Sequence, residues 1–147
     1  MFYDTDFLKN DEIYLKLDMT KTAEPSMGYV PVYFFSVINS VTGEAMGTCD
    51  LRIGYNENTY YGGNIGYKIY EKFRGRRYAA KACLLLFELA KKHGMRLIII
   101  TCDPDNAASR KTCEFIGCTF DKIIELPAHN EMYMIGQRRK CIYKIIL

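Results

Sequence analysis

The segment Lys72-Phe73-Arg74-Gly75-Arg76-Arg77-Tyr78-Ala79-Ala80-Lys81 marks the point where the pattern of this sequence changes from strand to helix. Five of these ten residues are basic. A helix N-terminus carries about four unpaired backbone N–H groups and roughly half a positive charge, so arginines placed there oppose the helix dipole. The alternative interpretation, a surface helix that begins with solvated basic residues, does not explain why the arginines lie at the end of the helix that disfavours them. The segment is therefore predicted to bind an anion such as a pyrophosphate, with Gly75 free to adopt unusual backbone angles and Ala79 small enough for close approach.

A long amphipathic helix is predicted directly after this turn, over residues 77–93. Its charged residues fall on one narrow stripe, and apolar residues fill most other positions. Gly94 suits the position that follows the helix. A continuous apolar run then predicts a strand at 97–102 that is covered on both faces. The sequence Asp103-Pro104-Asp105-Asn106 predicts the start of a second helix, ending at Gly117, because Asp caps helices and Pro suits their first turn.

Residues upstream of the turn predict a meander of short strands. Alternating or β-branched segments occur at 13–17, 32–39, 45–55 and 64–70, and turn-like segments, including 56–63, separate them. Two closing strands are predicted at 118–126 and 140–147. Because a helix crosses between the strands at 64–70 and 96–102, these two are predicted to form a locally parallel pair. The predicted fold class is α+β, with a mixed, mostly antiparallel sheet.

The basic turn resembles the cofactor signature of the GNAT superfamily, which reads Arg or Gln, two residues, Gly, one residue, then Gly or Ala. Arg74 and Ala79 fill its ends, and Arg77 stands where the family has its central Gly. Residues 106–120 resemble the family's Asn-x-x-Ser and Glu-x-x-Gly-Phe segment. The resemblance covers residues 32–120. It implies a single GNAT-like domain over residues 1–147, in which helices flank the sheet. The strands at 64–70 and 97–102 are then expected to splay apart.

The family implies acetyl-CoA as the cofactor and transfer of its acetyl group to a primary amine by direct attack in a ternary complex. Pantetheine is then expected to bond to the strand edge near Ile69 and Tyr70. Asn106 and Ser109 match residues that approach the pantetheine and the thioester. The resemblance places the pyrophosphate on the turn formed by Arg74, Gly75, Arg76, Arg77, Tyr78 and Ala79.

Both positions that usually carry the family's proton transfers are replaced. The carboxylate base falls on Asn64, which cannot accept a proton, and the tyrosine acid falls on Cys113. Cys113 is a candidate proton donor, a backbone N–H near Tyr70 is a candidate donor to the thioester carbonyl, and Glu71 is a candidate base. The other candidate bases or water-positioning groups are Asp50 and Tyr67. These replacements leave a second hypothesis open, that of a catalytically weak acyl-CoA-binding or sensing module.

Relatives usually have one or two helices between the first two strands, where this chain has only residues 19–31. The N-terminal helices are therefore expected to be shortened or absent. The acceptor, a small-molecule or protein amine, is expected to enter an open cleft or one completed by a second subunit of a homodimer.

Composition argues against several other classes of protein. The net charge is only +3, so a nucleic-acid-binding domain that uses the basic turn is a disfavoured rival. Six cysteines without Cys-x-x-Cys spacing and two histidines predict no metal site. No apolar run reaches the ~20 residues of a membrane span. With no signal-peptide pattern and the cysteines mostly in apolar runs, a reduced cytoplasmic setting is expected.

Overall fold

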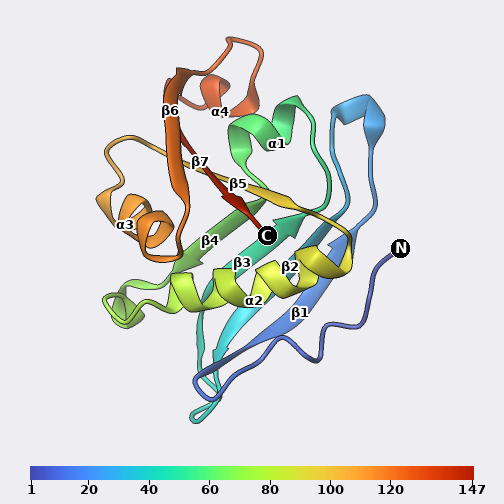
Figure 1. The fold of residues 1–147 in the computed structure, drawn as a ribbon, viewed down its shortest axis with the longest axis vertical. Coiled ribbons are helices and arrows are strands. Elements are labelled where there is room, and N and C mark those ends of the chain that lie inside the picture. Colours follow the sequence, from blue (N-terminus) through green and yellow to red (C-terminus); the bar gives the residue numbers. More distant parts are fainter.

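The computed structural model describes residues 1–147 and arranges seven strands in two antiparallel sheets (Figure 1). The first sheet has the order β1-β2-β3-β4, with bounds β1 (Ile13–Lys21), β2 (Val32–Asn39), β3 (Ala45–Arg52) and β4 (Ile65–Ile69). The second sheet has the order β5-β7-β6, with bounds β5 (Leu97–Cys102), β6 (Thr119–Glu125) and β7 (Arg139–Ile146). β4 and β5 thus belong to different sheets.

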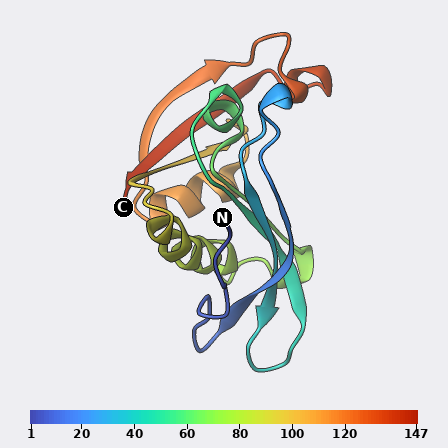
Figure 2. The ribbon, with the colours of Figure 1, turned by 90° about the vertical axis from the view of Figure 1, so that its right-hand side faces the viewer.

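Helices lie mainly on one side of the first sheet. Figure 2 shows α2 (Tyr78–Lys92) and α3 (Ala107–Phe115) on one side, and the short 3₁₀ helix η1 (Pro25–Met27) and α4 (Glu131–Met134) towards the other. α1 (Glu57–Gly62) precedes β4, and the 3₁₀ helix η2 (Glu71–Phe73) follows it. No helix is long and apolar enough to cross a membrane.

The hydrophobic core lies between α2 and the first sheet. Alternate residues of β2, namely Tyr33, Phe35 and Val37, are buried there, whereas Phe34 between them is only half-buried on the other face. Leu86 and Leu89 of α2 belong to the same buried cluster. The period-2 burial of β2 therefore fixes which strand residues face α2 and which face the opposite side of the sheet.

The predicted fold class is confirmed, and the only helical element between β1 and β2 is the three-residue η1. Some expected bounds were wrong. The helix expected to start at Asp103 starts at Ala107, because the side chain of Asn106 accepts the Ser109 N–H and residues 103–106 form a turn. The expected turn at 56–63 contains α1, which begins with a capping box between Asn56 and Thr59.

The two sheets meet at Asn64, which lies directly before β4 and is completely buried. Its backbone N–H donates to the Ile99 carbonyl at 2.6 Å. Its side-chain Oδ1 accepts the Ile99 N–H at 2.9 Å. Its Nδ2 donates to the carbonyls of Arg52 at 3.2 Å and Gly54 at 2.9 Å. Every polar group of this side chain is therefore used to hold β5 against the end of the first sheet.

Beyond this junction, β4 and β5 share no ladder. The Arg52 N–H donates to the Asn64 carbonyl and the Tyr70 N–H to the Met46 carbonyl, so the even-numbered residues of β4 bond to β3. The N–H groups of Tyr67 and Ile69 consequently point away from β3, towards the gap beside β5. Neither N–H has a hydrogen-bond partner in the chain, so β4 presents an open edge.

We expect Asn64→Asp to lower the free energy of unfolding by about 3 kcal/mol, because a carboxylate would face two buried carbonyls without a proton to donate. Urea unfolding measures the effect. The matched control is Asn10→Asp, since the exposed Asn10 side chain only accepts hydrogen bonds, from the N–H groups of Glu12 and Ile13. Equal effects of the two substitutions would contradict the role assigned to Asn64.

Candidate active site

The basic turn exposes a continuous row of free backbone donors. The N–H groups of residues 75–80 have no hydrogen-bond partner in the chain, whereas the next one, of Lys81, donates to the Arg77 carbonyl. Gly75 has a φ of 88° and Arg77 a φ of 63°. Consecutive N–H groups around left-handed residues form a concave cradle for anions, and a helix N-terminus adds to its positive potential. The turn thus has the geometry of a phosphate-binding site.

Arg77 is the only non-glycine residue with a positive φ. It occupies the N-cap position of α2 without a side-chain capping bond. Its guanidinium carbon lies 3.9 Å from the centre of the Phe115 ring, whose residue is 52% exposed on α3. The left-handed conformation costs about 1–2 kcal/mol in a residue with a side chain. The stacking on Phe115 offsets part of this cost and ties the start of α2 to α3.

Arg74 connects the turn to the open edge of β4. Its Nε donates to the Ile69 carbonyl at 2.9 Å. Arg76 is exposed and makes no ion pair within the chain. The structure therefore brings the predicted residues of the turn next to Ile69, at the end of the strand edge that carries free N–H groups.

Arg77→Gly should change stability differently in two backgrounds. In the wild-type chain the relieved strain and the lost stacking nearly cancel. In a Phe115→Ala background only the relief remains, so Arg77→Gly should raise the free energy of unfolding by about 1 kcal/mol. Urea unfolding of the four proteins of this cycle measures the difference. An identical effect of Arg77→Gly in both backgrounds would disprove the coupling.

Asn106, Ser109 and Tyr67 meet where α3 faces β4. Asn106 caps α3 by accepting the Ser109 N–H at 3.0 Å. The Ser109 hydroxyl lies 2.6 Å from the Tyr67 hydroxyl. Burial is the main cause that raises the pKa of Tyr67 well above its usual value, so this phenol stays protonated. Both predicted residues of α3 are therefore held by neighbours within the chain, beside the open edge.

The three residues predicted to be catalytic have different surroundings in the structure. Cys113 is completely buried, and its contact with Cys118, together with burial, raises its pKa far above the usual value. Its side chain also contacts Tyr67. The Tyr70 N–H is occupied by the Met46 carbonyl. Glu71 is exposed at the start of η2. Free donors on this edge belong instead to Tyr67 and Ile69.

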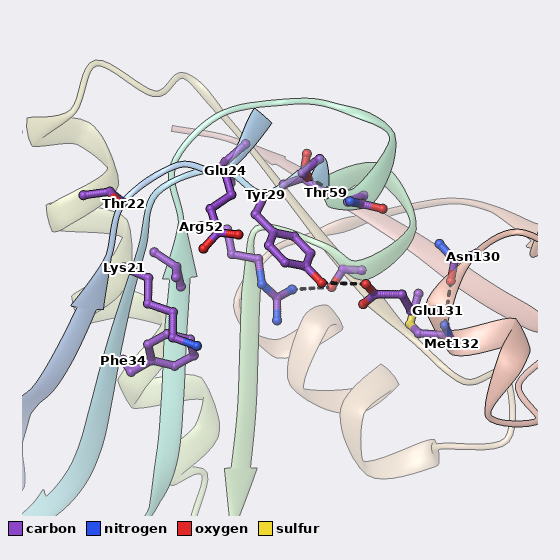
Figure 3. Close-up of a pocket in the computed structure, with 15 residues that line it drawn as sticks. Lys21, Thr22, Glu24, Tyr29, Phe34, Arg52, Thr59, Asn130, Glu131 and Met132 are labelled. Carbon is purple, nitrogen blue, oxygen red and sulfur yellow. Dashed lines mark hydrogen bonds between the residues drawn. The ribbon is translucent and has the colours of Figure 1, made fainter. Parts of the chain in front are cut away.

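The opposite face of the first sheet carries two adjoining hollows, with volumes of about 420 and 340 Å³, and Phe34 lines both. Figure 3 shows the larger one, between η1, α1 and α4. The Tyr29 hydroxyl donates to Glu131 Oε1 at 2.6 Å across it. The smaller hollow lies over β2, β3 and β4 and includes Asp50 and Gly66. We call the two together the acceptor groove, after the role that is proposed for them below.

Sequence reasoning missed most of this groove. Phe34 could have been found from the sequence, because adjacent residues of a strand point to opposite faces and Phe35 is a core residue. Tyr29 and Glu131 are 102 positions apart in the chain, and no local pattern signals their contact. Nor was α4 predicted, although the Asn130 side chain accepts the Met132 N–H as a typical cap.

Asp50 is the most unusual ionisable residue of the groove. Its side chain is 18% exposed, and its Oδ1 is buried without a hydrogen-bond partner. Arg52 Nη2 lies 3.3 Å from this oxygen, too poorly aligned for a hydrogen bond, while Arg52 Nη1 donates to the Gly62 and Gly63 carbonyls. Burial raises the pKa of Asp50, and Arg52 opposes the shift only in part.

Asp50→Asn should therefore stabilise the protein at neutral pH. The raised pKa means that ionising Asp50 costs more in the folded than in the unfolded chain, and this penalty is complete above the folded pKa. Below the ordinary value of 3.8 both states hold the proton, so the gain should vanish there. The charged neighbours that the substitution leaves in place are Asp18 and Lys68, which line the smaller hollow with Asp50, and Arg52, whose Nη2 lies 3.3 Å from Asp50 Oδ1. Urea unfolding of wild type and Asp50→Asn, from below pH 3.8 to neutral pH, measures this difference in stability. A lower stability of Asp50→Asn at neutral pH would contradict the prediction.

Comparisons with known proteins identify the family of this chain. The model of the acetyltransferase (GNAT) domain matches residues 8–119. The chain therefore belongs to the GNAT acetyltransferase family, as the motifs of the basic turn and of α3 predicted. No curated protein matches the chain.

Several solved structures share the fold. A GNAT-family acetyltransferase from Bacillus anthracis is 23% identical, with a TM-score of 0.62, and the match covers 77% of this chain and 65% of that one. The microcin C7 self-immunity acetyltransferase, in complex with acetyl-CoA and AMP, is 19% identical, with a TM-score of 0.63 and coverage of 79% and 61%. An acetyltransferase from Salmonella typhimurium that modifies the N-terminal serine of ribosomal protein L7/L12 is 20% identical, with a TM-score of 0.60 and coverage of 83% and 66%. The chain spans less than two thirds of the length of each.

Proposed function

We propose that this chain is an N-acetyltransferase that moves the acetyl group of acetyl-CoA to a primary amine by direct attack in a ternary complex. The observation that carries the proposal is that two sets of backbone N–H groups without hydrogen-bond partners lie next to each other. Six consecutive N–H groups of residues 75–80 lie at the end of the same strand edge on which Tyr67 and Ile69 have free N–H groups. An anionic head joined to an amide-containing chain matches this combination.

The residues present fit acetyl-CoA. The N–H groups of the turn, with Arg74, Gly75, Arg76, Arg77, Tyr78 and Ala79, would hold the pyrophosphate. A side chain at Gly75 would meet nothing within 4 Å, so the cradle is open to a ligand. The Ile69 N–H would bond to the pantetheine beside Tyr70, and Asn106 and Ser109 would flank it. When bound, acetyl-CoA supplies an activated thioester. The Tyr67 N–H is the donor best placed to polarise the thioester carbonyl.

The acceptor would enter from the other face, along the acceptor groove. With only η1 between β1 and β2, that groove has one thin wall, which suits a protein amine as well as a small one. A relative of the same fold modifies the N-terminal serine of a ribosomal protein, so a protein N-terminus is one acceptor within this proposal. A homodimer could complete the groove. All six cysteines are free, which suits the reducing cytoplasm.

A second candidate function is an acyl-CoA-binding or sensing module with little turnover. It is favoured by the use of Asn64 as a junction between sheets and by the complete burial of Cys113, since both usual proton-transfer positions are then withdrawn from solvent. Binding of the cofactor is common to both functions. Release of the coenzyme A thiol in the presence of primary amines separates them.

Isothermal titration with acetyl-CoA tests the cofactor site. Arg76→Ala should weaken binding about tenfold, because one charge-assisted contact to phosphate is lost. Gly75→Val should weaken it further, since a β-branched residue cannot easily adopt a φ of 88°. Lys122→Ala is the matched control, because Lys122 is exposed on β6, away from the turn. No binding by the wild-type protein, or equal binding by all variants, would contradict the proposed cofactor.

A further inference from the structure

We propose that Asp50 on β3 is the general base of this acetyltransferase, taking the place of the carboxylate that position 64 lacks. The inference rests on the proposed function and names the residue that removes the proton from the acceptor amine. It depends on where the Asp50 carboxylate lies, on the space that Gly66 leaves for it, and on the groove that leads to it.

Asp50 lies directly across the ladder from Gly66, one residue before the free Tyr67 N–H. A Cβ atom built on Gly66 would lie 2.8 Å from Asp50 Oδ2 and 3.3 Å from Oδ1. The carboxylate therefore rests on the β4 backbone in the space where any other residue would place its side chain. A thioester whose carbonyl accepted the Tyr67 N–H would lie beside this same stretch of β4.

The approach to Asp50 comes from the side opposite α2. Asp50 and Gly66 line the smaller hollow of the acceptor groove, which adjoins the larger one at Phe34. The Lys21 ammonium lies 5.7 Å from the centre of the Phe34 ring, so this floor already accommodates a cation. An amine that entered over Phe34 would meet Asp50 before it reached β4.

Other carboxylates near this face are less suited to the task. Asp18 lines the same hollow, but its Oδ2 already accepts the Ser36 hydroxyl at 2.7 Å and the residue is exposed. Glu71 is exposed beyond the end of β4. Asp50 alone combines burial, a position against β4 and an oxygen, Oδ1, that accepts no hydrogen bond although Arg52 Nη2 lies 3.3 Å away. Its raised pKa also makes it a stronger proton acceptor than an ordinary aspartate.

The proton balance is complete with the residues and substrates named. The acceptor arrives as an ammonium ion, and Asp50 takes one of its protons. The freed nitrogen lone pair forms a bond to the thioester carbon, and the carbon–sulfur bond breaks with its electron pair moving to sulfur. The nitrogen gives a second proton to that sulfur, directly or through water. An amide, a coenzyme A thiol and protonated Asp50 result, and Asp50 returns its proton to water.

The activity test compares wild type, Asp50→Asn and Asp121→Asn for thiol release from acetyl-CoA. The acceptor panel contains a polyamine, a peptide with a free N-terminus and a lysine peptide with a blocked N-terminus. Asp50→Asn should lower kcat roughly 10²–10⁴-fold with unchanged affinity for acetyl-CoA. Its deficit should shrink at alkaline pH, where free amine is abundant. Asp121→Asn removes a carboxylate paired with Lys144 at 3.2 Å on β6 and should leave kcat unchanged.

Each outcome decides between the two proposals. Thiol release at equal rates by wild type and Asp50→Asn would overturn the base assignment and leave the proposed function intact. No release by wild type with any amine would overturn the proposed function and the base together.

A readout without turnover tests the assignment independently. The resonance of the Asp50 carboxyl carbon is followed by NMR as a function of pH in the protein without ligand. The Asp50→Asn variant, which lacks this resonance, provides its assignment. A midpoint above the ordinary 3.8 is expected, and one at or below it would overturn the assignment.

Discussion

The two-point contact between Asn64 and Ile99 is the interaction on which the rest of this structure depends. A strand normally joins its neighbour through a ladder, but here one asparagine supplies both a backbone donor and a side-chain acceptor to a single residue of β5. The same amide holds the end of β3 through Arg52 and Gly54. Because these hydrogen bonds join the two sheets at Asn64, β4 and β5 can diverge immediately afterwards while their starting points stay together. Burial makes these bonds costly to break.

The divergence of β4 and β5 leaves backbone N–H groups without the hydrogen-bond partners that folded proteins normally provide. The edge of β4 and the start of α2 form one such surface, joined by Arg74. At the start of α2, Arg77 has a strained left-handed conformation, and stacking of its guanidinium on Phe115 offsets part of the cost. Strain and unpaired donors cluster at functional sites because a ligand completes them. Asp50, on the opposite face of the sheet, also has a polar atom without a hydrogen-bond partner. Its carboxylate lies beside Gly66, and its Oδ1 accepts no hydrogen bond.

The sequence predicted the elements whose signals are local. The bounds of β2 followed from its apolar, aromatic and β-branched composition, and the span of α2 followed from helical periodicity. The basic turn followed from charges that oppose a helix dipole. Asn64 shows the limit of this reasoning. Its position suggested a missing catalytic base, whereas its role as a junction depends on Ile99, 35 positions later. The acceptor groove was hidden for the same reason, since Tyr29 and Glu131 meet only through the fold. Capping residues at Asn56 and Asn130 were visible, but α1 and α4 are too short to show periodicity.

Amide hydrogen exchange, residue by residue, tests the central claim most directly. The account predicts that without ligand the N–H groups of Tyr67, Ile69 and residues 75–80 exchange rapidly, while those of Gly66 and Lys68, which bond to β3, are protected. Adding coenzyme A should protect the first set and leave Gly66 and Lys68 unchanged. Protection of Tyr67 and Ile69 in the ligand-free protein, or no response of residues 75–80 to coenzyme A, would contradict the account.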